Sequence, residues 1–178
     1  PLFLSGGILI DLLISEKEKK TGEMLLALPT ERQKIYYSKF ISIMSIIFVQ
    51  LLFWILALFY LGRVNNPLII FPLIVTAILL LSITGLIGVY SKNYKDSSLI
   101  VTVTFILLFI MLFGTTTLYV AGLKGIATMS PLTLVIAIEN QIFSFREGLV
   151  SILPSLGFSF VLIYLSKTLY KKDEFYFG

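Results

Sequence analysis

Residues 68–90 read LIIFPLIVTAILLLSITGLIGVY, a run that contains no charged side chain. A helix needs about 20 apolar residues to cross the ~30 Å hydrocarbon core of a bilayer. A helix on the surface of a soluble protein instead carries polar residues along one face. This stretch therefore predicts a membrane-spanning helix, and it decides the fold class of the chain.

Three further stretches have the same character, at residues 40–61, 99–120 and 148–165. The last is the shortest and contains Pro154, where we expect a kink. Residues 1–14 are apolar but too short to span alone, so we expect them to end a span that begins upstream. The sequence predicts an all-α polytopic transmembrane helix bundle with four full spans plus the end of a truncated one.

The composition excludes several classes of function. Of the 178 residues, 57% are hydrophobic and 13% are charged, whereas about a quarter of an ordinary soluble domain is charged. Cys and His are both absent, which excludes disulfides, thiolate nucleophiles, Cys/His zinc sites and imidazole bases. The lipid bilayer is thus the expected solvent for most of the chain.

The basic residues are distributed unevenly along the chain. If successive spans cross in alternate directions, residues 15–39, 91–98 and 167–178 share one side of the membrane. That side carries eleven of the 14 Lys and Arg residues, and the connections at 62–67 and 121–147 carry the other three. Cytoplasmic loops are enriched in Lys and Arg. The net charge of +4 therefore indicates topology and not nucleic-acid binding: a multi-pass protein of the cell membrane with a cytoplasmic C-terminus.

The long connection on the opposite side contains a predicted helix near residues 130–145. Ser130 can cap it, and Pro131 suits its first position because a proline there loses no hydrogen bond. Apolar residues follow at helical spacing, but the stretch is too short to span. The sequence leaves two interpretations open, a re-entrant or interfacial helix in the outer leaflet and an external lid packed on the bundle.

Residues 15–40 form the long polar connection and read SEKEKKTGEMLLALPTERQKIYYSKF. Thr21 can cap a short helix, and Glu23 in its first turn is favourable to the helix dipole. Pro29 ends that helix. Its apolar patch consists of Met24, Leu25 and Leu28.

A second short helix is predicted after this break. Thr30 and Gln33 form a capping box, and the helix continues through Tyr36 toward the next span. Apolar anchors ringed by charge are typical of a protein-docking surface. The patch could instead lie on lipid headgroups, with the lysines on anionic phospholipid. The four acids of the segment favour docking, because an anionic bilayer repels them.

Three groups of residues in this connection form an ordered pattern: Glu16-Lys17-Glu18, then Thr21-Gly22-Glu23-Met24-Leu25-Leu26 with Pro29, then Lys39 after an intervening helix. The pattern resembles the cytoplasmic segment of type-2 ATP-binding-cassette (ABC) transporter permeases, roughly E-K-E-x-G-T-x-E-x-L-L-x-x-P followed by a Lys at the mouth of the next helix. Lys19-Lys20 stand where that family often has Gly, and Gly22 stands where an aliphatic residue is usual. The order of spans resembles the family along essentially the whole chain.

The resemblance implies that residues 15–39 are a coupling segment, which sits in a groove of a cytosolic ABC ATPase subunit and passes its closure on ATP binding to the membrane helices. It implies an exporter permease that works as a homodimer or pseudo-dimer. The chain itself would have no catalytic residue, metal or cofactor, and ATP and Mg²⁺ would bind to the partner ATPase. The implied ATPase-docking residues are Glu16, Lys17, Glu18, Thr21, Gly22, Glu23, Met24, Leu25, Leu26, Leu28, Pro29 and Arg32.

The alternative is a membrane-embedded scaffold or enzyme whose cytosolic segment docks a different partner. Without His or Cys, such an enzyme would need paired carboxylates or a Ser/Lys dyad close to the bilayer. The acids are instead concentrated in the coupling segment, which favours the transporter.

Polar residues elsewhere are candidates for a transport pathway, although each has a simpler interpretation. Asp11 is close enough to the interface to reach water, and Glu139 could bind a cation or meet water. Hydroxyl groups in the spans are expected to bond across helices, and glycines such as Gly85, Gly88 and Gly114 to allow close approach. The pathway candidates are Asp11, Gln50, Thr115, Thr116, Thr117 and Glu139.

Overall fold

The computed structural model describes residues 2–18, 32–62, 66–91, 95–106, 130–139 and 145–171, and these ranges contain helices and no strand. Residues 95–106 form a helix. The other elements are α1 (Leu2–Glu18), α3 (Arg32–Tyr60), the short 3-10 helix η1 (Pro67–Ile69), α4 (Ile70–Tyr90), α7 (Pro131–Glu139) and α8 (Phe145–Lys171).

Three helices in the described part of the chain are long and apolar enough to cross a membrane: Gln33–Tyr60, Ile70–Tyr90 and Gly148–Tyr170. They correspond to the predicted spans at 40–61, 68–90 and 148–165. Of the predicted span at 99–120, residues 99–106 are helical and the remainder lies outside the described residues. The all-α membrane fold is therefore confirmed, and the count of four full spans is not.

Two of the helices are longer than the apolar runs that predicted them. The second short helix expected after Thr30 and the following span are one continuous helix, α3, of 29 residues. The last span was predicted to be short, which is wrong: α8 has 27 residues and includes Pro154 in its interior. Hydropathy detects only the part of a helix that lies in hydrocarbon, whereas the backbone hydrogen bonds continue through the polar turns beyond it.

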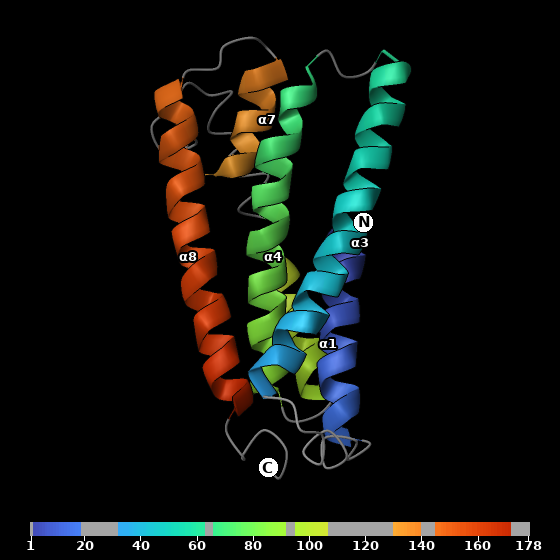
Figure 1. The fold of residues 1–178 in the computed structure, drawn as a ribbon, viewed down its shortest axis with the longest axis vertical. Helices are drawn as coiled ribbons and strands as arrows, with labels where there is room; N and C mark the ends of the chain where they lie inside the picture. The colour runs from blue at the N-terminus through green and yellow to red at the C-terminus, as the bar shows by residue number, and fades with distance from the viewer. Residues whose placement is uncertain are drawn as a thin grey trace.

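The bundle is organised around α4, which packs against α1, α3, α7 and α8 (Figure 1). Half of the α4 span is buried, against 22% of the span in α3 and 28% in α8. The face of α8 that includes Ser151, Ser155, Ser159 and Ser166 is buried. Small side chains at this spacing let two helix backbones approach closely. Membrane helices associate through such close packing, because the hydrophobic effect does not drive helices together in lipid.

Glycines in α4 create the contact with α1 and α3. A Cβ at Gly88 would lie 2.9 Å from Leu13 Cδ1 and 3.4 Å from the Cα of Ile10, both in α1. A Cβ at Gly85 would lie 2.7 Å from the hydroxyl oxygen of Tyr36 in α3. The predicted close approach at these two glycines is confirmed, while Gly114 lies outside the described residues.

Replacing Gly88 with Ala is expected to lower the free energy of unfolding by about 1–3 kcal/mol, because the added methyl group would overlap the Leu13 side chain at Cδ1 and crowd its Cβ at 3.3 Å. A Cβ added at Gly157 in α8 would meet no atom within 4 Å, so Gly157→Ala provides the matched control. That control is expected to leave stability unchanged or raise it by about 0.5–1 kcal/mol. Thermal unfolding in mild detergent measures both, and equal effects would contradict the close approach.

The hydroxyl groups of α4 behave differently from the prediction. The Thr76 hydroxyl donates a hydrogen bond to the carbonyl of Pro72 at 2.7 Å, and the Ser82 hydroxyl donates one to the carbonyl of Ile78 at 2.6 Å. Thr84 and Thr102 likewise donate within their own helices. Within the described residues these four donors therefore bond in their own helices, because a carbonyl one turn back is always within reach in a helix.

Helix α7 packs on the bundle beside the start of α4 (Figure 1). Leu134 and Ile138 are buried and form a small apolar cluster with Ile69. The Thr133 hydroxyl donates to the carbonyl of Ser130 at 2.7 Å, which supports the predicted helix start. The helix has nine residues, which is too few to span.

Candidate functional site

Three helix ends meet at one end of the bundle. Helix α1 ends there, α3 begins there and α8 ends there, while α3 ends and α4 and α8 begin at the opposite end (Figure 1). Residues 19–31, which join α1 to α3, lie outside the described residues. This end of the bundle is therefore where the chain leaves α1 and where it enters α3.

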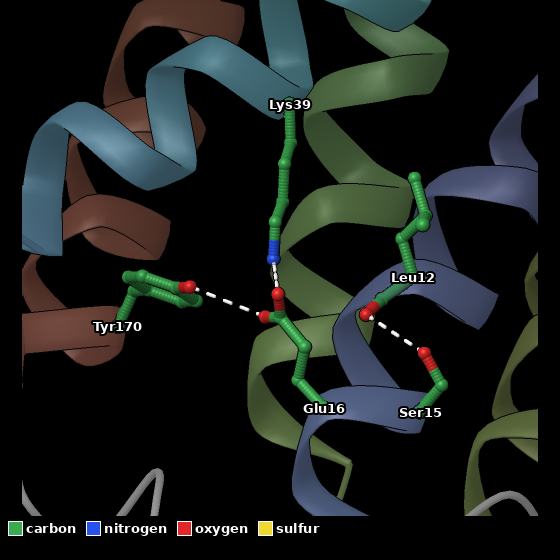
Figure 2. Close-up of polar contacts among 5 residues, drawn as sticks. All are labelled: Leu12, Ser15, Glu16, Lys39 and Tyr170. Carbon is green, nitrogen blue, oxygen red and sulfur yellow. Dashed lines mark hydrogen bonds and ion pairs between the residues drawn. The ribbon is translucent and has the colours of Figure 1, made fainter. Parts of the chain in front are cut away.

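A cluster of polar groups joins the three helices at this end. Glu16 of α1 forms an ion pair with Lys39 of α3 through Oε1, and its Oε2 accepts a hydrogen bond from the Tyr170 hydroxyl of α8 at 3.2 Å. Figure 2 shows both contacts converging on the Glu16 carboxylate. Since the three residues act through that carboxylate, we call them the Glu16 cluster.

The Glu16 cluster is shielded from solvent. The side chain of Glu16 is 13% exposed and that of Lys39 is 17% exposed. The Tyr170 side chain is fully buried, and the Lys39 ammonium lies 5.8 Å from the centre of its ring. An ion pair is screened less here than on an open surface, and losing either partner would leave a poorly hydrated charge.

Aromatic rings extend the contact between α3 and α8. The buried ring of Tyr36 lies 5.5 Å from the ring of Tyr170 and 6.3 Å from that of Phe40. The adjacent residue of α3, Tyr37, also contacts α8, since the Lys167 ammonium lies 5.4 Å from the centre of the Tyr37 ring. These contacts fix the start of α3 against the end of α8.

The geometry of the Glu16 cluster fits a structural tie, meaning a set of contacts that holds the helices together, and not acid–base chemistry. Both carboxylate oxygens of Glu16 are engaged, one by a cation and one by a hydroxyl donor. A general base needs an oxygen that can reach a substrate proton. The cluster instead joins two positions that are 23 residues apart in sequence, one at each end of the coupling segment.

Of the predicted ATPase-docking residues, the structure places only Glu16 in a described contact. Lys17 and Glu18 are in the last turn of α1 and Arg32 is the first residue of α3, with side chains outside the described set. The remaining docking residues, which are Thr21, Gly22, Glu23, Met24, Leu25, Leu26, Leu28 and Pro29, lie outside the described residues.

The predicted pathway residues do not come together in the described part of the chain. Asp11 is on the exposed face of α1, and Gln50 is exposed near the middle of α3. Glu139 is the last residue of α7, with a side chain outside the described set. Thr115, Thr116 and Thr117 lie outside the described residues altogether.

Two functional candidates were missed by sequence reasoning, Tyr36 and Tyr170. Tyrosines at the ends of spans usually anchor a helix at the membrane interface. Tyr60 and Tyr90 fit that pattern, with 89% and 73% exposure. A signal for Tyr170 was its position one turn after Ser166 on the buried face of α8, which would have pointed it inward.

Comparison with known proteins agrees with the fold. The chain matches the family model described as ABC-2 family transporter protein over residues 1–168. No curated protein and no solved structure matches it. The matched region contains residues 15–39, with Glu16 and Lys39, and nearly all of the three candidate spans. The chain therefore belongs to the ABC-2 transporter family, as a multi-pass membrane component of the transport permease type.

Proposed function

We propose that this chain is the permease subunit of an ATP-driven exporter in the cell membrane, moved by a cytosolic ABC ATPase that grips residues 15–39. One observation carries the proposal: the Glu16–Lys39 ion pair closes the coupling segment at its two ends. Family membership supports a transport permease, and the Glu16 cluster supplies a route by which force on the segment reaches the bundle.

The route follows from the connectivity of the cluster. Because Glu16 lies in the last turn of α1 and Lys39 lies near the start of α3, the ion pair makes the two helices move together when the segment is displaced. The Tyr170 hydroxyl adds α8 to the same unit. Packed helices transmit such shifts as rigid bodies, since a close-packed interior deforms little. ATP binding, with Mg²⁺, and hydrolysis take place on the partner subunit.

A second copy of the permease completes the proposed assembly. The amide side chain of Gln50 is exposed near the middle of the α3 span, among the exposed side chains of Ile46, Val49 and Phe53. A polar amide facing hydrocarbon is costly, because lipid offers it no hydrogen bond. Contact between copies along this face would give the amide a partner and place the transport pathway between two subunits.

We infer the orientation of the assembly in the membrane from the distribution of basic residues. The end with the Glu16 cluster carries Lys34, Lys95 and Lys167 among the described residues. An excess of basic residues marks the cytoplasmic side of membrane proteins. With this orientation both the coupling segment and the C-terminus face the ATPase.

Replacing Leu25 and Leu28 together with Asp is expected to abolish stimulation of the ATPase by the permease and to weaken co-purification of the two subunits. Two carboxylates in an apolar docking patch would have to be buried without partners. The measurement is ATPase activity of the purified complex in mild detergent, with membrane insertion checked in parallel.

The matched control is Lys19→Asp with Lys20→Asp, which changes the charge of the same segment but leaves its apolar patch intact. If the segment only rests on anionic lipid, this control would impair function as much as the leucine variant does. Unchanged stimulation and unchanged co-purification in the leucine variant would refute the docking role.

A further inference from the structure

An apolar groove runs between α3 and α8 close to the end that carries the Glu16 cluster. The two helices meet at that end and diverge toward the other (Figure 1). The groove has a volume of about 610 Å³ and is lined by Tyr37 and Phe40 of α3 and by Phe160, Val161, Tyr164 and Leu165 of α8. Phe160 is 70% exposed and Tyr164 is 64% exposed, so their apolar surface faces the surroundings of the bundle.

A cation lies at the polar end of this groove. The Lys167 ammonium is 5.4 Å from the centre of the Tyr37 ring, whose side chain lines the groove. Lys167 follows Ile163, another lining residue, by one helical turn, so it lies on the same side of α8. Lys39, a second cation in this part of the described structure, is engaged with Glu16. Lys167 is thus the basic group placed to meet a ligand in the groove.

An apolar groove inside a span with a cation at its interfacial end matches one class of ligand. A phospholipid offers an acyl chain to the apolar walls and a phosphate to the ammonium group. Anionic lipids of the cytoplasmic leaflet attract basic residues near the surface, by about 1 kcal/mol for each Lys or Arg, or about fivefold in binding. The sequence places Lys171 and Lys172 directly beyond Lys167, which adds positive charge at the same end.

We propose that this groove is a binding site for an anionic phospholipid of the inner leaflet, with an acyl chain between α3 and α8 and the headgroup phosphate at Lys167. The proposal rests on the cytoplasmic orientation of this end but not on coupling to an ATPase. Occupation by a second copy of the chain is disfavoured by charge: a two-fold contact along this groove would bring Lys167 of each copy close to the other.

A bound lipid would hold α3 and α8 at a fixed spacing beside the Glu16 cluster. Tyr37 and Phe40 flank Lys39 in α3, and Tyr170 follows Lys167 in α8 within a turn. Lipid binding is therefore expected to raise the thermal stability of the protein, because a ligand that binds only the folded state stabilises it.

The test is native mass spectrometry of the purified full-length transporter in mild detergent, titrated with phosphatidylglycerol or with phosphatidylcholine. The wild-type protein is expected to retain phosphatidylglycerol preferentially. Lys167→Gln is expected to reduce that preference about fivefold and to remove the matching rise in melting temperature. Lys95→Gln serves as the control, since Lys95 is exposed at the same end, whereas Lys167 contacts the ring of Tyr37, which lines the groove.

Equal losses in Lys167→Gln and Lys95→Gln would overturn the proposal, because they would show attraction to general surface charge. No loss in Lys167→Gln would overturn it as well. Val161→Trp, which fills the groove, is expected to reduce retention of both lipids, and unchanged retention would contradict an acyl chain there.

A cysteine variant distinguishes a bound lipid from a second copy of the chain as the occupant of the groove. The chain contains no Cys, so Val161→Cys introduces a single reactive thiol. If two copies met along the groove, oxidation would join them by a disulfide in the membrane. We expect no such dimer, and its formation would assign the groove to the interface between copies.

Discussion

Replacing Lys39 with Met is expected to lower the free energy of unfolding by about 2 kcal/mol and to uncouple the permease from its ATPase. The change leaves the Glu16 carboxylate, which is 13% exposed, with the Tyr170 hydroxyl as its remaining partner in the Glu16 cluster. Removing one member of a fully buried ion pair costs about 3–5 kcal/mol, and partial exposure reduces this. Denaturant unfolding in detergent and ATPase stimulation provide the two measurements.

Two controls separate a local tie from a general charge effect. Lys34→Met removes a lysine from the exposed face of the same helix, and its expected effect on stability is within about 0.5 kcal/mol. The double variant Glu16→Met with Lys39→Met leaves no unpaired charge and is expected to recover most of the lost stability. Loss of stimulation in a stable double variant would show that the tie acts in coupling. Equal effects of Lys39→Met and Lys34→Met would contradict the ion pair.

Two neighbouring tyrosines are expected to respond in opposite ways to loss of the hydroxyl group. Tyr170→Phe removes a hydrogen bond to a carboxylate, and its expected cost is about 1.5–3 kcal/mol. Tyr36 is fully buried, but its hydroxyl makes no hydrogen bond within the described residues. Tyr36→Phe is therefore expected to be neutral or stabilising, because the lone hydroxyl no longer has to be desolvated. Thermal unfolding of the two single variants measures the difference.

Ser166 of α8 lies beside the Tyr36 hydroxyl. A hydrogen bond between the two hydroxyl groups would reverse the result expected for Tyr36→Phe. The Ser166 hydroxyl donates to the carbonyl of Leu162 at 2.8 Å, and no bond of ordinary geometry joins it to Tyr36. A loss of about 1 kcal/mol in Tyr36→Phe would reveal such a bond. Tyr36→Ala, in contrast, is expected to cost about 3–5 kcal/mol, because it opens a cavity beside Leu9 and Gly85.

The fold could be predicted from the sequence because a long run of apolar residues in a membrane protein has one dominant explanation, a helix that crosses the bilayer. The run at 68–90 lies within η1 and α4, and the run at 40–61 lies within α3 except for Leu61. Gly85 and Gly88 make the close contacts expected of small residues. The helix ends were predicted less well. Helix α3 begins at Arg32 and α8 continues to Lys171, because helical hydrogen bonding does not stop where the apolar residues stop.

The candidate site could be predicted only in part. Glu16 and Lys39 stood out because they belong to an ordered motif, but their contact joins positions 23 residues apart across a long connection. The contact with Tyr170 joins positions 154 residues apart. A sequence pattern reports which residues share a helix face, and it does not report how two helices are rotated against each other. The Ser and Thr donors illustrate the same limit, since a bond within a helix competes with one across helices.

A single thiol in residues 15–39 would report whether a cytosolic ATPase holds this segment, as we propose. Because the chain has no Cys, Leu25→Cys is a unique reporter in the apolar patch. We expect a membrane-impermeant maleimide to leave Leu25→Cys unlabelled from outside intact cells, and to label it from the inner side only when the ATPase subunit is absent. Labelling from outside, or equal labelling with and without the ATPase, would show that no cytosolic ATPase covers this segment.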